Sequence, residues 1–388
     1  MSKSIVALMR CDSYEESKVH KAVLDGVDLL GGILSFVQPG EKIVIKPNVL
    51  FGSHPDKCVT THPLVLKAVG EILKQAGIDI RYGDSPGVGS CERHIKRAGF
   101  EQISHTLGIR LVDFNNGKFV THKDALLCKH FVIANGVLES DGLISLSKLK
   151  AHQLTRITGA IKNQFGCIPG ILKSEYHMRM PDPYDFSKML VDINTFIKPR
   201  LYIMDAIIAM EGNGPRNGKP KKLGALLLSN DPVALDSIAA KIVALNPECV
   251  PTLLAGELAG LGTYHYENIE VVGEDITQFI DPDFEVCRTP PISSKGGCIR
   301  KFLKNRISQR PVISNVVCTK CGTCVDICPV NPKAVNMLTD DRSKSPTYKY
   351  NQCIRCYCCQ ESCPEGAITV KDTPLGLIFR KVNVINRI

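Results

Sequence analysis

Apolar and polar positions follow two different periods over the first three quarters of the chain. Short apolar runs typical of buried strands occur at 5–8, 42–45, 78–82, 131–134, 143–146, 201–204 and 225–228. Between them, apolar residues repeat every three to four positions over 62–75, which predicts a helix that Gly77 ends. Further helices are predicted over 158–168 and 187–197. Strands that alternate with helices of this length predict an α/β fold, a mostly parallel sheet with helices on both faces.

The pattern changes after about residue 285, and four segments are predicted. Residues 1–285 form the α/β domain. Residues 286–315 hold Pro290-Pro291, Gly296-Gly297 and many basic side chains, which is typical of a linker, with one short helix near 299–307. Residues 316–370 form a small cysteine-rich α+β domain. In the tail, 371–388, apolar and basic residues alternate, and we expect it to pack against the main domain.

Eight cysteines form two matched runs in the cysteine-rich segment. Each run reads Cys-x-x-Cys-x-x-Cys-x-x-x-Cys-Pro, and the second follows the first by 35 residues. This is the bacterial ferredoxin pattern for a pair of 4Fe-4S clusters, in which the fourth cysteine of each run ligates the other cluster. The predicted ligands of cluster I are Cys318, Cys321, Cys324 and Cys363. The predicted ligands of cluster II are Cys328, Cys353, Cys356 and Cys359.

Zinc and disulfides are the competing interpretations of these cysteines. A structural zinc ion takes four ligands, commonly from two Cys-x-x-Cys pairs, and does not account for two matched quartets. Disulfides require an oxidising compartment, and no signal for export is present at the start of the chain. Cys358 lies out of register with the repeat, so we predict that it is not a ligand.

The charge distribution and the hydropathy argue against two classes of protein, those that bind nucleic acid and those that span a membrane. The net charge is +9, with 31 basic and 33 acidic side chains in residues 1–287 against 17 and 6 in residues 288–388. Because thiolate-ligated clusters are anionic, they offset part of the C-terminal positive charge. Phe302 is the one aromatic residue in the basic stretch between 287 and 317, which argues against nucleic-acid binding. No run approaches the ~18 apolar residues of a membrane span, so we expect a cytoplasmic protein.

Polar residues gather in the loops after several predicted strands. In an open α/β sheet, ligands bind beyond the carboxyl ends of the strands. The residues expected in such a pocket are Lys46, Asn48, Asp84, Ser85, Lys148, His152, Asn163, Asp205, Glu211 and Asn213. Its lysines suggest a small anionic ligand, and the candidates for catalysis are Lys148, Lys150, His152 and Lys162. The alternative is ordinary turn chemistry, with the lysines facing water.

Several ordered blocks resemble a known family. They are Lys46-Pro47-Asn48, Gly83-Asp84-Ser85-Pro86-Gly87, Lys148-Leu149-Lys150-Ala151-His152, Thr158-Gly159-Ala160-Ile161-Lys162-Asn163 with Phe165-Gly166-Cys167, Glu211-Gly212-Asn213-Gly214-Pro215 and Asp231-Pro232-Val233-Ala234-Leu235-Asp236. Together the chain resembles the domain-of-unknown-function 362 family fused to a double 4Fe-4S ferredoxin module. The resemblance implies a cytoplasmic iron–sulfur protein of a kind common in anaerobes, and it supplies no substrate.

Three functions follow from these patterns as hypotheses. In the first, the clusters carry single electrons between a redox partner protein and whatever the α/β domain binds. In the second, the clusters feed a reductase whose catalytic, anion-binding pocket lies in the α/β domain. In the third, the protein is a redox sensor or assembly factor without turnover.

Overall fold

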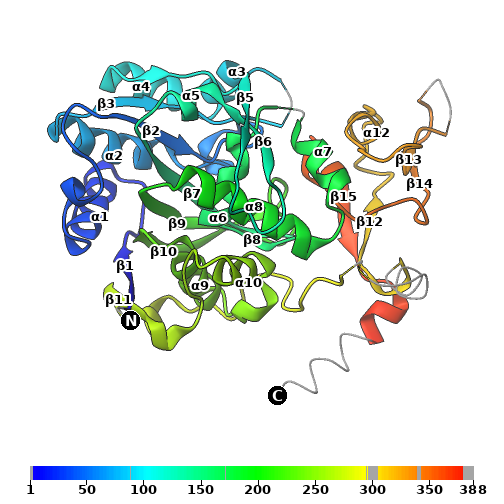
Figure 1. Ribbon diagram of the computed structural model, residues 1–388. Helices are drawn as coiled ribbons and strands as arrows, with labels where there is room; N and C mark the ends of the chain where they lie inside the picture. The colour runs from blue at the N-terminus through cyan, green and yellow to red at the C-terminus, as the bar shows by residue number, and fades with distance from the viewer. Residues whose placement is uncertain are drawn as a thin grey trace.

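The computed structural model describes residues 3–87, 89–170, 172–293, 295, 305–338 and 342–378. In this part of the chain one nine-stranded sheet forms the centre of the molecule (Figure 1), with strand order β11-β1-β10-β9-β7-β2-β3-β4 and β8 paired to β7. The strands are β1 (Ser4–Arg10), β2 (Lys42–Pro47), β3 (Asp79–Tyr82), β4 (Arg110–Leu111), β7 (Gly142–His152), β8 (Arg156–Thr158), β9 (Leu201–Glu211), β10 (Lys219–Ser229) and β11 (Ile269–Gly273). The predicted α/β class is confirmed, because β4, β3, β2, β7 and β9 run parallel to one another.

Helices cover both faces of this sheet. One face packs against α1 (Glu16–Leu29), α2 (Pro63–Gln75), α3 (Cys91–Arg97) and α4 (Phe100–Leu107). The other packs against α6 (Ala160–Asn163), α7 (Leu172–Arg179), α8 (Pro183–Ile197), α9 (Pro232–Ile242) and α10 (Pro251–Leu258). Neighbouring residues of a strand point to opposite faces, so Ile43 and Ile45 belong to the first core and Val44 to the second.

Helix starts follow local capping rules. The predicted helix at 62–75 is α2, where Pro63 occupies the first turn and the His62 ring accepts a hydrogen bond from the Leu64 N–H. Asp231 caps α9 in the same way, accepting from the N–H groups of Val233 and Ala234. Both caps place the first turn directly after a strand or a polar loop.

Two segments differ from their predicted form, and a third has the predicted form but lies outside the main sheet. Strand β7 continues through 148–152, which was predicted as a loop, because it pairs with β8 and β9. The predicted helix at 158–168 is a strand end, the short helix α6 and a 3-10 turn over Gln164–Cys167. The predicted strand at 131–134 is β6 (His130–Ala134), which forms a separate hairpin with β5 (Gly117–Thr121), followed by α5 (Asn135–Leu138).

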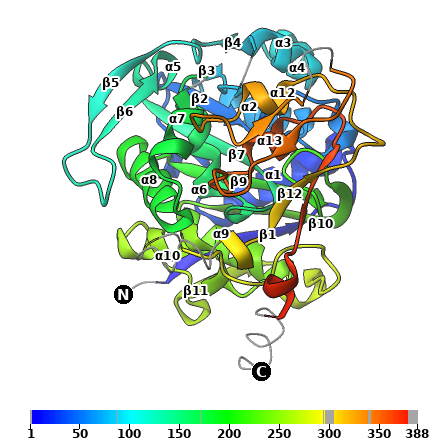
Figure 2. The ribbon, with the colours of Figure 1, turned by 90° about the vertical axis from the view of Figure 1, so that its right-hand side faces the viewer.

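The C-terminal unit is small and lies against one side of the sheet domain (Figures 1 and 2). Its strands pair as β12 (Arg310–Ile313) with β15 (Ile368–Lys371) and β13 (Val335–Asn336) with β14 (Thr347–Tyr348). Its helices are α12 (Thr323–Asp326) and α13 (Cys358–Ser362). Strand β12 begins inside the stretch predicted as a linker. Most of the helix predicted near 299–307, and the tail from 379 onward, fall outside the described residues.

Candidate functional site

The eight repeated cysteines surround two cavities in the C-terminal unit. One cavity, of about 330 Å³ including space open to solvent, is lined by Cys318, Cys321, Cys324 and Cys363. The other, of about 320 Å³ on the same measure, is lined by Cys328, Cys353, Cys356 and Cys359. Each cavity therefore receives three thiols from one run and the fourth from the other run. Four soft sulfur donors around one space are a donor set that fits an iron–sulfur cluster.

Hydrogen-bond donors surround these sulfurs. The Tyr348 hydroxyl donates to Cys359 Sγ at 3.2 Å, and the Lys320 N–H donates to Cys318 Sγ at 3.4 Å. Burial and the neighbouring cysteines raise the pKa of Cys324 to about 12. Because a cluster ligand is a thiolate, bound iron is what would keep this buried sulfur deprotonated.

Removing the Tyr348 hydroxyl should lower the reduction potential of the cluster that Cys359 binds. Reduction adds negative charge to the sulfurs, and a hydrogen bond stabilises that charge. We expect Tyr348→Phe to shift one cluster to lower potential in an EPR-monitored potentiometric titration. Tyr350→Phe is the matched control, since Tyr350 stacks on Tyr348 but donates to the Pro311 carbonyl. Equal potentials in both variants would contradict the assignment.

Helix α13 joins the two units. All five of its residues, Cys358–Ser362, are buried. The Gln360 amide donates to the Asn213 carbonyl at 3.0 Å, to Asn213 Oδ1 at 2.9 Å and to the Gly214 carbonyl at 3.1 Å. In return Arg216 and Asn217 donate to the Ser362 and Cys363 carbonyls. The loop after β9, residues 212–218, is therefore the part of the sheet domain to which the cysteine-rich unit docks, and we call it the docking loop.

A histidine and a carboxylate meet at the same junction. His152 Nε2 lies 3.0 Å from Glu361 Oε1, and both side chains are buried. The N–H groups of Leu154 and Thr155 donate to His152 Nδ1, so the ring proton is on Nε2 and points at Glu361. Burial lowers the pKa of His152 to about 4, so the ring is neutral at pH 7. Burial by itself would raise the pKa of Glu361, but His152 and nearby Lys162 lower it to about 2.

Three of the predicted lysines are held by internal partners. Lys46 Nζ lies 2.7 Å from Asp84 Oδ1, and Lys148 Nζ lies 2.9 Å from Asp205 Oδ2. Lys150 Nζ donates to Asn48 Oδ1 and to the Val59 carbonyl, both at 2.7 Å. These contacts lie at the carboxyl ends of β2, β7 and β9, and each of the three lysines has at least one internal partner there.

The segment around α6 is held in position by a hydrogen-bonded carboxylate and by a closely packed glycine. Asp236 on α9 accepts from the N–H groups of Ala160 and Ile161 and so fixes the start of α6. Gly166 passes so close to Asp84 that an added Cβ would lie 1.9 Å from its carboxylate. A glycine is needed there because no side chain fits. The result is that Asn163 reaches the end of β2, where its amide donates to the Lys46 carbonyl.

A pocket lies between the two units. Its empty volume, including space open to solvent, is about 770 Å³. Predicted residues that line it are Asn48, Asp84, Ser85, Lys162 and Asn163. Predicted residues outside its lining are Lys46, Lys148, Lys150, His152, Asp205, Glu211 and Asn213. Of the last two, Glu211 accepts from the Glu285 N–H and Asn213 lies in the docking loop.

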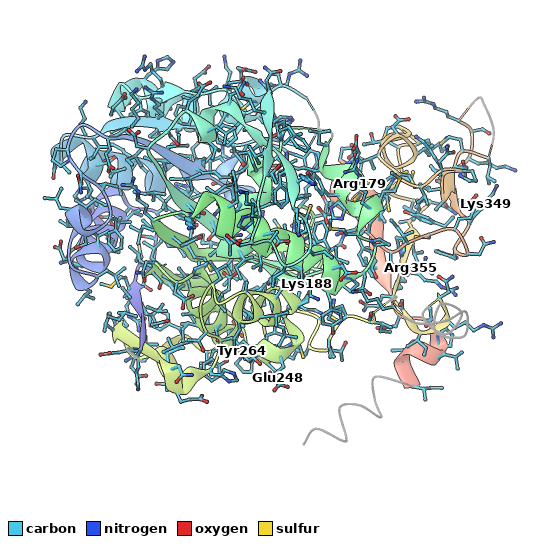
Figure 3. The ribbon with its side chains drawn as sticks, in the orientation of Figure 1. Arg179, Lys188, Glu248, Tyr264, Lys349 and Arg355 are labelled. Atoms are coloured by element: carbon cyan, nitrogen blue, oxygen red, sulfur yellow. The ribbon has the colours of Figure 1, made fainter. Side chains whose placement is uncertain are left out.

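Other residues of this pocket were not predicted. Lys173 and His177 come from α7, and Ile327, Cys358 and Glu361 come from the cysteine-rich unit. Helix α7 carried no clear apolar period, and residues of the second unit can be assigned to the pocket only once the docking is known. Figure 3 labels Arg179, the last residue of α7, at the boundary between the two units.

Two family models match the chain. One, described as a domain of unknown function (DUF362), covers residues 43–241, which include β2, β7, β9 and α6. The chain belongs to the DUF362 family. The second, a 4Fe-4S dicluster domain, covers residues 310–364 and contains all eight repeated cysteines. This DUF362 protein is therefore an iron–sulfur protein with a ferredoxin-type electron-transfer domain.

Relatives are found for both parts of the chain. The thylakoid-associated protein sll1697 of Synechocystis sp. is 37% identical over 257 residues, which are 66% of this chain and 79% of that protein. Pyruvate synthase subunit PorD of Methanocaldococcus jannaschii is 31% identical over 78 residues, 20% of this chain and 77% of that protein. The lactate racemase apoprotein of Thermoanaerobacterium thermosaccharolyticum aligns with a TM-score of 0.39 and 14% identity, over 61% of this chain and 56% of that chain.

Among the helices in the described residues, none has the length and apolar character needed to cross a membrane.

Proposed function

We propose that this DUF362 protein carries two 4Fe-4S clusters and exchanges single electrons between a redox partner protein and a small anionic ligand in the pocket between its units. Cluster I is held by Cys318, Cys321, Cys324 and Cys363, and cluster II by Cys328, Cys353, Cys356 and Cys359. Such thiolate clusters supply reversible one-electron transfer. A cytoplasmic location is part of the proposal, since the thiols must stay reduced until clusters form.

One observation carries the proposal: the pocket shares a wall with the cluster-binding unit. Ile327 and Cys358, which line the pocket, are direct sequence neighbours of the cluster II ligands Cys328 and Cys359. A small molecule bound in this pocket would therefore lie against residues that directly adjoin, in sequence, two of the cysteines that hold cluster II. Cys321, a ligand of cluster I in this proposal, is exposed, so we expect a partner protein to reach cluster I.

The experiment is reconstitution of the whole chain without oxygen. We expect about eight iron atoms per chain and two clusters that are reduced reversibly in the low-potential range of ferredoxins. Iron analysis and EPR of dithionite-reduced protein measure both. Four irons per chain, or zinc in place of iron, would sink the proposal.

A cluster-fed reductase is the second candidate. It is favoured by Lys162, whose Nζ makes no hydrogen bond within the described residues and lines the pocket beside Glu361. A basic group that faces the substrate pocket is what such an enzyme needs for an anionic substrate. Lys162→Ala should then abolish turnover of any acceptor found by screening while cluster spectra stay unchanged. Unchanged turnover would leave the protein a carrier.

A further inference from the structure

Lys173 is the pocket lysine that no sequence pattern indicated. It lies on α7 and lines the pocket on the side of the sheet domain. Its Nζ donates to Ser85 Oγ at 2.9 Å and to the Pro86 carbonyl at 3.3 Å. Both acceptors are neutral. Lys173 thus has hydrogen bonds but, within the described residues, no carboxylate in direct contact.

The two carboxylates near Lys173 already have other partners. Asp84 pairs with Lys46 through one oxygen, at 2.7 Å, and accepts from the Val49 N–H through the other, at 2.8 Å. Glu361, on the opposite wall, faces His152 at 3.0 Å. Neither carboxylate is in direct contact with Lys173, and Asp84 acts on its charge only through space.

The remaining side chains of the sheet domain around Lys173 do not supply negative charge either. Burial raises the pKa of Cys91 and of Cys167 to about 12, so both thiols are neutral. Burial lowers the pKa of His177, one turn further along α7, to about 4, so this ring is neutral too. Lys162 on α6 adds a second basic group to the same pocket.

This environment disfavours the charged form of Lys173. Burial lowers its pKa to about 7, an effect that Asp84 opposes and Lys46 reinforces. Near neutral pH the side chain is then about half protonated. An anion in the pocket would favour the ammonium form and draw a proton onto it.

We propose that the pocket binds a small carboxylate or oxyanion together with one proton, and that Lys173 takes up this proton to pair with the anion while Lys162 provides the second basic contact. The inference rests on the proposed function, because it takes the pocket between the units as the ligand site, and it adds the chemical class of the ligand and the group that recognises it.

The pH dependence follows from linkage. The pKa of Lys173 is low in the ligand-free protein and higher in the anion-bound protein. Binding therefore takes up protons at pH values between these two pKa values. Affinity is highest below about pH 7 and falls by up to about tenfold for each pH unit above it. An anion that met only permanently charged groups would bind equally well over this range.

Calorimetric titration of the cluster-loaded chain tests the inference. Sulfate serves as the oxyanion probe and malonate as the carboxylate probe, since both are almost fully dianionic between pH 7.5 and 9. We expect one of them to bind with affinity that drops by about tenfold from pH 7.5 to 8.5. Repeating the titration in buffers with different ionisation heats should show up to one proton taken up per anion.

Two variants test whether protonation of Lys173 causes the pH dependence. Lys173→Arg keeps a charge at every pH, so we expect anion binding that no longer depends on pH. Lys349→Arg is the control, because Lys349 is exposed at the outer edge of the cysteine-rich unit (Figure 3), and it should behave as the natural chain does. Flat affinity in the natural chain, the same pH dependence in Lys173→Arg, or no binding of either probe would each overturn the inference.

Iron content and EPR, measured on the same samples, separate this inference from the proposed function. Samples with both clusters and flat or absent anion binding would overturn the inference and leave electron transfer standing. Samples that bind the probe with a proton but hold no iron would overturn the proposed function instead.

Discussion

Lys46→Met should destabilise the chain by about 3–5 kcal/mol. Lys46 and Asp84 form a fully buried ion pair, with nitrogen and oxygen 2.7 Å apart and side chains 0% and 4% exposed. Removing the lysine leaves an uncompensated carboxylate in the interior, and breaking a buried pair in this way is costly. Urea unfolding of the natural chain and the variant, monitored by circular dichroism, measures the difference.

Two controls make the Lys46 result specific. In the double variant Lys46→Met with Asp84→Asn no charge is left behind, so most of the lost stability should return. Lys21 and Asp25 form a pair of nearly the same length, 2.8 Å, but Lys21 is 77% exposed. Lys21→Met should cost less than about 1 kcal/mol. A small loss in Lys46→Met, similar to that in Lys21→Met, would contradict the importance of the buried pair.

Cys356→Ala and Cys358→Ala should give opposite results although the two thiols are two residues apart. Cys356 lines the second cysteine cavity, whereas Cys358 faces the pocket between the units. We expect Cys356→Ala to bind about four iron atoms in place of about eight, and Cys358→Ala to keep about eight. Iron analysis and EPR after identical reconstitution make the comparison. The reverse outcome would mean that Cys358 is the ligand.

Much of the fold could be predicted because its determinants are local. The helix at 62–75 is marked by its apolar period and by Pro63, and both features act within one turn of the chain. The strand at 42–45 is a short apolar run, and it forms the centre of the parallel part of the sheet. The ferredoxin pattern is equally local, since the spacing of a few cysteines specifies which loops can surround a cluster.

The parts that were not predicted depend on contacts between distant residues. The extension of β7 through His152 requires pairing with β8, and the irregular segment after Thr158 requires Asp236, which lies 76 residues beyond Ala160. The lysines at the strand ends were assigned to one pocket, but their partners, such as Asp205 for Lys148, remove them from it. Lys173 entered the pocket because α7 packs there.

The hydrogen bonds of Gln360 mean that the ferredoxin-like segment is not an interchangeable cassette. Its cysteine spacing is that of a free-standing carrier, yet the Gln360 side chain is 0% exposed and its three acceptors all belong to the loop after β9. Excised from this chain, the segment would present a helix shaped for a surface that is no longer there. Its fusion to the sheet domain is thus built into the cluster-binding helix itself.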